Sequence, residues 1–295
     1  MQNRWKILSY PMASEQKVFD HVSQQLREAE QNSIVVLPEY VAYTEANAAK
    51  ALEMLVDVCQ TRQISVITTL NLVPVDLPHA ASGVNYNTLT VVTKEGKVHT
   101  PQAKITPQSF ERVQYQPNFP QMNVGDYEYL NRVTVEIDGE QFHVFFVICS
   151  DVYCLMAGVE KIEDIKADYC IVPGNFGNGA EQAARRTLQR FREAGIFGTT
   201  IFSNPYQVVK EGQIPLVREA VEMMTAEADS PINELTDWDR IQLVKNNVAI
   251  YPDEQVPSFV HMAKLTPMDQ GRMTMGMSRF SVTVQIGIYP ETIIL

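Results

Sequence analysis

The apolar positions of this chain follow two alternating spacings through its first two hundred residues. Short segments such as residues 34–37 and 144–148 are apolar throughout, which is typical of buried strands. Between such segments, apolar residues recur every three or four positions, as from Val18 to Leu26. This alternation predicts βαβ units and an α/β fold. The expected strands are residues 4–10, 34–37, 64–70, 85–93, 97–100, 132–137, 141–148, 169–172 and 198–203, and the expected helices are residues 14–26, 48–59, 159–165 and 180–194.

Two pairs of neighbouring strands are separated by turn signals. Glu95-Gly96 separates residues 85–93 from 97–100, and Asp138-Gly139-Glu140 separates residues 132–137 from 141–148. Such short connections predict antiparallel hairpins. Because βαβ units make parallel pairs, we expect mixed sheets.

The pattern weakens after residue 206. Residues 214–226 favour a helix, residues 237–251 a helix that passes into a strand, and residues 279–289 an edge strand. No linker or change of composition divides the chain. We therefore expect a single domain, residues 1–295, whose C-terminal third, about 207–295, is irregular.

Composition excludes several classes of protein. Hydrophobic residues at 45% and charged residues at 20% are those of a globular protein. The net charge of −11 argues against binding nucleic acid, and no apolar run predicts a membrane span or an export signal. The cysteines lack disulfide spacing, which favours a cytoplasmic location. The five histidines show no metal-ligand spacing and no phosphate-binding loop is present, so we expect no metal and no cofactor.

Three residues point to chemistry. Cys149 ends the apolar run 144–148, Glu39 follows a short buried strand and Pro38, and Lys104 lies in the next long loop. A thiol that attacks a carbonyl carbon needs a base and a positive group near the developing oxyanion. A carboxylate would raise the pKa of the thiol, and a lysine would offset that effect.

The order of these motifs resembles the nitrilase, or carbon–nitrogen hydrolase, superfamily. The motifs are Val-Val-Leu-Pro-Glu39, Gln-Ala-Lys104 and Val-Ile-Cys149-Ser-Asp151, followed by a strand ending at Asn175 and an Arg-rich helix before a strand ending at Asn204. Together they cover roughly the first two-thirds of the chain. The segment 152–156 departs from the Arg-Phe-Pro-Glu that many members carry after the nucleophile, which puts the substrate class in doubt.

The resemblance implies a four-layer α-β-β-α sandwich and a homodimer or higher homo-oligomer. It also implies that a small amide-type molecule is the substrate. By position, Cys149 is the nucleophile, Glu39 the general base, Lys104 the group that stabilises the tetrahedral intermediate, and Glu111 an auxiliary residue. The backbone N–H of Ser150 joins Lys104 at the oxyanion. The residues expected to contact substrate are Ser150, Tyr153, Asn175 and Phe176.

Other interpretations stay open. The same scaffold allows nitrile hydrolysis, acyl transfer to an amine, or a non-catalytic protein that binds a small molecule or a partner. A papain-like enzyme is disfavoured because only His261 follows the cysteine. Each candidate residue also has a structural interpretation. Cys149 would then be a structural thiol, Glu39 a helix cap, Lys104 a solvated loop lysine, Glu111 part of an exposed ion pair with Arg112, and Asn175 a turn residue. The arginines of residues 185–192 would form a solvated helix face or a dimer surface. Asp151, Cys154 and Cys170 are expected to be structural.

Overall fold

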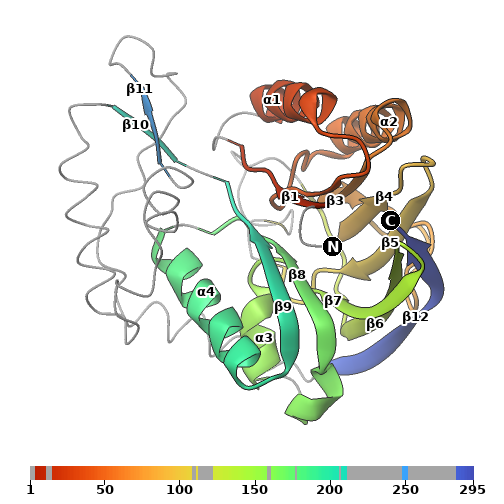
Figure 1. Ribbon diagram of the computed structural model, residues 1–295, viewed down its shortest axis with the longest axis vertical. Coiled ribbons are helices and arrows are strands. Elements are labelled where there is room, and N and C mark those ends of the chain that lie inside the picture. The colour runs from red at the N-terminus through yellow and green to blue at the C-terminus, as the bar shows by residue number, and fades with distance from the viewer. Residues whose placement is uncertain are drawn as a thin grey trace.

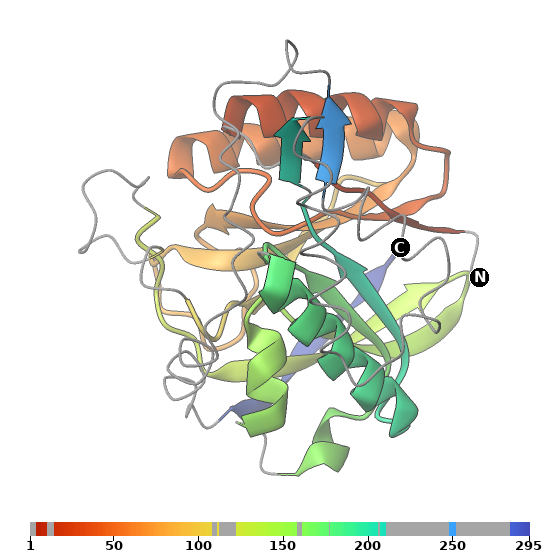
Figure 2. The same cartoon turned by 90° about the vertical axis from the view of Figure 1, so that its left-hand side faces the viewer.

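Two five-stranded sheets lie face to face in the computed structural model, with helices on their outer sides (Figure 1). The structure describes residues 4–10, 15–107, 111, 122–157, 161–176, 178–205, 207–210, 248–251 and 284–295. Helices α1 (Glu15–Glu28) and α2 (Glu45–Arg62) cover the first sheet, and α3 (Asp151–Ala157) and α4 (Asn178–Glu193) cover the second (Figure 2). This is the α-β-β-α order of layers that the motifs implied.

The first sheet has the order β1-β2-β3-β4-β5. Its first three strands are parallel, and β3, β4 and β5 pair antiparallel, so the predicted mixed sheet is confirmed. The bounds are β1 (Trp5–Ile7), β2 (Ile34–Val36), β3 (Ser65–Leu72), β4 (Tyr86–Val92) and β5 (Val98–Ala103).

The second sheet has the order β12-β6-β7-β8-β9 and is also mixed. The hairpin of β6 and β7 turns through Asp138 and Gly139, at φ of 57° and 82°. Both residues therefore occupy the left-handed region that a tight hairpin turn requires. The bounds are β6 (Tyr129–Ile137), β7 (Glu140–Phe146), β8 (Ala167–Pro173), β9 (Phe197–Ser203) and β12 (Gln285–Ile294), and a separate parallel pair is formed by β10 (Gln207–Lys210) and β11 (Val248–Tyr251).

Apolar spacing decides which faces are buried. In α1, Val18, Val22 and Leu26 fall on one side of the helix and pack toward the first sheet. Between the sheets, side chains such as Val36 and Val133 share one core. Since both faces of the central strands are covered, β2 and β3 are apolar or uncharged along their whole length.

The segment after Cys149 differs from the prediction. A helix was expected at residues 159–165. Instead, α3 begins directly at Asp151, and the described part of the expected segment, from residue 161 on, contains a 3₁₀ helix, Ile162–Ile165. Val152 and Leu155 are buried toward the second sheet, and Asp151 lies in the first turn of α3, where an acidic residue is favourable. Burial of these side chains stabilises the short helix, although its sequence pattern is too weak to predict it.

The last third of the chain is described only in part. Residues 248–251 form a strand, as expected for the end of segment 237–251, and β12 is the edge strand expected near residues 279–289. The predictions for residues 214–226, 237–247 and 279–283 fall outside the described residues. No helix within the described ranges is long and apolar enough to cross a membrane.

Candidate functional site

Three predicted site residues lie at or shortly after the ends of strands of the two sheets. Glu39 follows β2, Lys104 follows β5 and Cys149 follows β7. Backbone hydrogen bonds fix each of these positions: Glu39 N–H donates to Gly174 O at 2.9 Å, Lys104 N–H to Asn87 O at 2.9 Å, and Cys149 N–H to Pro173 O at 2.9 Å. The bond from Glu39 crosses from the first sheet to the end of β8 in the second, so the site lies where the two sheets meet.

Lys104 joins two carboxylates in the interior. Its Nζ donates to Glu39 Oε1 at 2.8 Å and to Glu111 Oε2 at 2.8 Å. All three side chains are almost completely buried. The alternative readings of Lys104 as a solvated loop residue and of Glu111 as half of an exposed pair are therefore wrong. Glu39 is not a helix cap either, because α2 begins at Glu45 after Thr44.

Two further side chains hold the same carboxylates. Asn87 of β4 donates from Nδ2 to Glu39 Oε1 at 2.7 Å and to Glu111 Oε1 at 3.0 Å. The hydroxyl of Tyr40 donates to Glu111 Oε1. Sequence analysis missed both residues. The signal for Tyr40 was its position next to Glu39, whereas Asn87 carried only the weak signal of a polar residue in a strand.

Cys149 sits in a left-handed turn between β7 and α3, at φ of 48°. Few non-glycine residues adopt this conformation, and where it occurs it is often held by surrounding structure at a functional site. The thiol is 6% exposed, and the backbone N–H of Asn175 lies 3.4 Å from Sγ. The turn thus presents the sulfur at the junction of β7 and β8.

The electrostatics favour a protonated resting thiol. Burial raises the pKa of Cys149 well above its usual value, and the Glu39 carboxylate raises it further, while Lys104 and the Asn175 N–H act in the opposite direction. Burial also raises the pKa of Glu39; Lys104 lowers it, and Glu111 raises it. Burial alone would lower the pKa of Lys104, but Glu111 and Glu39 raise it well above its usual value. Lys104 is therefore a permanent cation between two carboxyl groups.

Asp151 connects the turn at Cys149 to the loop that carries Lys104. Its carboxylate accepts from Ile105 N–H at 2.9 Å, from Thr106 N–H at 2.8 Å and from the Thr106 hydroxyl at 2.7 Å. Ser150 Oγ lies 2.9 Å from Thr106 Oγ1. Burial raises the pKa of Asp151 to about 6 despite these donors. Asp151 is a structural acceptor, as predicted.

The remaining predicted residues lie around Cys149. The ring of Tyr153 meets that of Phe176 edge-on at 6.1 Å, and its hydroxyl donates to Ala180 O at 2.9 Å. Phe176 is buried and stacks on Phe202. Asn175 contributes its backbone N–H to the sulfur, a contact that sequence analysis did not foresee. Whether these residues contact substrate stays a prediction.

The Arg-rich helix α4 does not present all of its arginines to solvent. Arg185 donates to Glu181 at 2.8 Å and lies 4.6 Å from the centre of the Phe202 ring. Arg190 and Arg192 are exposed. Cys59, Cys154 and Cys170 are buried, as expected for core residues.

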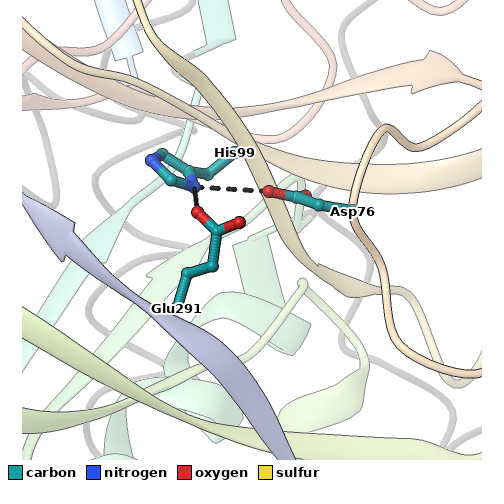
Figure 3. A group of neighbouring side chains, drawn as sticks. All are labelled: Asp76, His99 and Glu291. Atoms are coloured by element: carbon teal, nitrogen blue, oxygen red, sulfur yellow. Dashed lines mark ion pairs between the residues drawn. The ribbon is translucent and has the colours of Figure 1, made fainter.

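One group outside this site has the composition of a metal centre. Asp76, His99 and Glu291 each bring one ligand atom to within 4.8 Å of the others (Figure 3). Each already has partners: Asp76 accepts from Thr100, His99 Nδ1 lies 2.7 Å from the Tyr289 hydroxyl, and Glu291 pairs with Lys97. Since Lys97 already neutralises Glu291, this group fits a hydrogen-bond network between the sheets better than a cation site.

Comparisons with known proteins identify the fold. No family model matches the sequence, and no curated protein sequence matches it. A carbon–nitrogen hydrolase superfamily protein from Xanthomonas campestris superposes with a TM-score of 0.51 at 12% identity, over 69% of this chain and 76% of its own. A carbon–nitrogen hydrolase from Helicobacter pylori gives 0.49 at 15% identity over 70% and 74%, and an amidase from Nesterenkonia gives 0.47 at 17% identity over 68% and 74%. The superposition on the Xanthomonas campestris protein shows that the chain has the nitrilase-like fold that its motifs implied.

Proposed function

We propose that the protein hydrolyses a non-peptide C–N bond, of an amide or carbamoyl group in a small molecule, through a thioester on Cys149. The observation that carries this proposal is the buried network of Glu39, Lys104 and Glu111 beside a thiol held in a left-handed turn. The fold shared with a carbon–nitrogen hydrolase superfamily protein supports it at a coarser level.

The first step makes the thioester. Glu39 takes the thiol proton as Sγ bonds to the carbonyl carbon, and the carbonyl electron pair moves to oxygen. Lys104 Nζ and the backbone N–H of Ser150 stabilise the oxyanion. When the carbonyl re-forms, the C–N bond breaks and Glu39 returns its proton to the departing nitrogen, which leaves as ammonia or an amine.

Water completes the cycle. Glu39 takes a proton from water, and the resulting hydroxide attacks the thioester carbon. The second oxyanion is stabilised by the same two donors, Lys104 Nζ and the backbone N–H of Ser150. Its collapse releases the acid, and the sulfur recovers the proton from Glu39. Burial raises the pKa of Glu39, which makes this carboxylate a stronger base for the thiol proton than an exposed glutamate would be.

The test is a panel of ω-amides, carbamoyl amines, aliphatic amides and nitriles, assayed for ammonia. We expect turnover of at least one amide or carbamoyl compound by the wild type and none by Cys149→Ala, because the nucleophile is lost. A melting temperature unchanged from the wild type would show that the variant is folded. Turnover of the whole panel by Cys149→Ala at the wild-type rate would contradict the proposal.

Two related activities are separated in the same experiment. Addition of hydroxylamine or a primary amine tests whether the acyl group passes to nitrogen in preference to water, which would indicate a transferase. Turnover confined to the nitriles would assign nitrile hydrolysis instead. Trapping of a protein-bound acyl group by mass spectrometry, at Cys149 and absent in Cys149→Ala, is the direct sign of the thioester.

A further inference from the structure

Asn87 occupies a position between the two carboxylates that Lys104 joins. Its Nδ2 donates 2.7 Å to Glu39 Oε1 and 3.0 Å to Glu111 Oε1, and the side chain is 1% exposed. Asn87 lies in β4, where its backbone carbonyl also accepts from Lys104 N–H. One residue of β4 thus touches all three charged members of the site.

The orientation of the Asn87 amide follows from its surroundings. If the amide were flipped, Oδ1 would face two carboxylate oxygens and repel both. In the observed orientation Oδ1 has no hydrogen-bond partner among the described residues, although it is buried. An unpaired buried acceptor lowers stability. Asn87 therefore retains an unfavourable oxygen in order to present two N–H donors.

The two donors have a geometric consequence for Glu39. Lys104 and Asn87 both donate to Oε1 of Glu39, and neither of them donates to Oε2. The carboxylate is thus held through Oε1, and its side chain also interacts with the Cys149 thiol. Rotation of the Glu39 carboxylate away from this orientation would break both bonds to the bound oxygen.

We propose that Asn87 is a positioning residue that keeps Glu39 and Glu111 ionised together around Lys104 and turns the free oxygen of Glu39 toward Cys149. The Asn87 amide acts through the carboxylates and touches no reacting atom. This inference rests on the proposed function for its catalytic meaning, but its structural content, the stabilisation of two adjacent carboxylates, can be measured without a substrate.

The charge balance explains why two carboxylates need this donor. Glu39 and Glu111 carry two negative charges, and Lys104 supplies one positive charge. A hydrogen bond to the ionised form of a carboxyl group favours that form, so loss of the Asn87 donors raises the pH at which the pair takes up its first proton. The titratable groups that face the pair are Lys104 after β5, Cys149 after β7, Tyr40 after β2 and Tyr10 after β1.

The test is the carboxyl titration of protein labelled with ¹³C at the glutamate side-chain carboxyls. Glu39→Gln and Glu111→Gln identify the two resonances, and their midpoints are compared in the wild type and in Asn87→Ala. We expect the first midpoint of the pair to move to higher pH in Asn87→Ala. An unchanged midpoint in a folded Asn87→Ala protein would overturn the proposal.

A matched control exists in the second sheet. Asn131 is also buried, also donates twice from Nδ2, to Pro101 O at 2.8 Å and to the Tyr127 hydroxyl at 2.9 Å, and also has an unpaired Oδ1. Its partners are neutral. Asn131→Ala should therefore lower stability and leave both carboxyl midpoints where they are. If both variants moved the midpoints alike, the effect would be one of general loosening, and the proposal would fail.

Activity gives a second readout. In Asn87→Ala we expect kcat/KM to fall about tenfold to a hundredfold, with the acid limb of its pH profile displaced to higher pH. If Asn87→Ala does not fold, Asn87→Thr keeps one shorter donor and should give a smaller displacement in the same direction.

Should the wild type turn over no compound in the panel while the carboxyl midpoint still moves, the proposed function fails and the role of Asn87 stands. If the wild type turns over a compound but the carboxyl midpoint does not move in Asn87→Ala, the proposed function stands and the role of Asn87 fails.

Discussion

Glu39 receives opposing influences from its closest neighbours. Burial and the Glu111 carboxylate raise its pKa, whereas Lys104 lowers it. A residue that must accept a proton from a thiol and later return it needs such an intermediate basicity. Glu111 therefore acts on Glu39, the proposed base, by repulsion between the two carboxylates, which raises the pKa of Glu39.

Replacement of Glu111 should move the pH profile in a defined direction. Because Glu111 raises the pKa of Glu39, Glu111→Gln should shift the acid limb of kcat/KM to lower pH. The rate at the plateau should also fall, since Lys104 loses one of its two anchors. The measurement is kcat/KM from pH 4 to 8, with Glu45→Gln at the exposed start of α2 as the control. An acid limb displaced upward would contradict this view of Glu111.

Lys104 also contributes to the free energy of unfolding. Lys104→Met removes the cation between two buried carboxylates, and breaking a buried pair in this way costs about 3–5 kcal/mol. Adding Glu111→Gln should recover part of that loss, since it removes one of the uncompensated charges. Urea unfolding of the single and double variants measures both effects. Lys97→Met is the comparison, because the exposed pair of Lys97 with Glu291 should contribute about 1 kcal/mol or less. Equal losses for Lys104 and Lys97 would be inconsistent with the structure.

At the scale of elements, the loop after β5 and the start of α3 form one unit. The carboxylate of Asp151 accepts three hydrogen bonds from Ile105 and Thr106, directly after Lys104. Asp151 itself lies two residues after Cys149. This arrangement fixes Lys104 relative to the Cys149 sulfur, because Asp151 holds together the two segments that carry them.

Loosening that unit should affect the rate more than the fold. In Asp151→Asn the new amide NH₂ faces the N–H donors of Ile105 and Thr106, so at least one bond is lost at a cost of about 1–3 kcal/mol. A displacement of Lys104 of about 1 Å would lower kcat by roughly a hundredfold. Steady-state kinetics and thermal unfolding of Asp151→Asn test this, with Asp164→Asn in the exposed 3₁₀ helix as the control. Wild-type kcat in the folded variant would refute the coupling.

The molecule as a whole is closed by a strand from the end of the chain. β12 pairs with β6 at the edge of the second sheet, and Tyr289 of β12 reaches across to the first sheet, where its hydroxyl meets His99 of β5 and Asp76. Figure 3 shows Asp76, His99 and Glu291 converging from three separate segments. The two sheets are thus joined by polar contacts at this edge as well as by the apolar core.

This network predicts a loss of stability in acid. Burial alone would raise the pKa of Asp76, but hydrogen bonds from His99, Thr100 and Tyr289 lower it to about 2. A folded-state pKa below the unfolded value of about 3.9 contributes stability at higher pH, and that contribution disappears as the pH falls toward 2. The difference in unfolding free energy between the wild type and Asp76→Asn should therefore shrink between pH 4 and pH 2. Glu291→Gln, which changes another carboxylate of the same group, is the matched control. If the difference in unfolding free energy between the wild type and Asp76→Asn stayed constant from pH 4 to pH 2, this network would not be the source of the acid sensitivity.

Self-association stays a prediction at this scale. The exposed Arg190 and Arg192 leave part of α4 available for contact with a second copy. A dimer that uses this face should dissociate when both arginines are replaced by glutamate. Sedimentation of the wild type and the double variant at micromolar concentration measures this, and a monomeric wild type would dismiss the expectation.

The sequence by itself determined the strands of the two five-stranded sheets, most of the described helices and the three residues that follow β2, β5 and β7. These depend on local properties: apolar periodicity specifies which side of an element is buried, and turn residues specify where it ends. Glu39 and Cys149 could be singled out because each is a reactive residue after the end of an apolar strand, and Lys104 because it lies in the following long loop at the place that the resemblance gives it. Helix α3 was missed because seven residues give too little periodicity to recognise.

Only the tertiary structure decided how these residues meet. Glu111 became a buried partner of Lys104, and Asn87 became the donor between two carboxylates, through contacts that span 7 and 48 residues along the chain. Register between β3, β4 and β5 places Asn87 beside Lys104, and no local pattern encodes that register. The position of Cys149 at the end of a strand was therefore foreseeable, whereas the burial and the neighbouring charges that shift its pKa arise only when folding brings distant residues together.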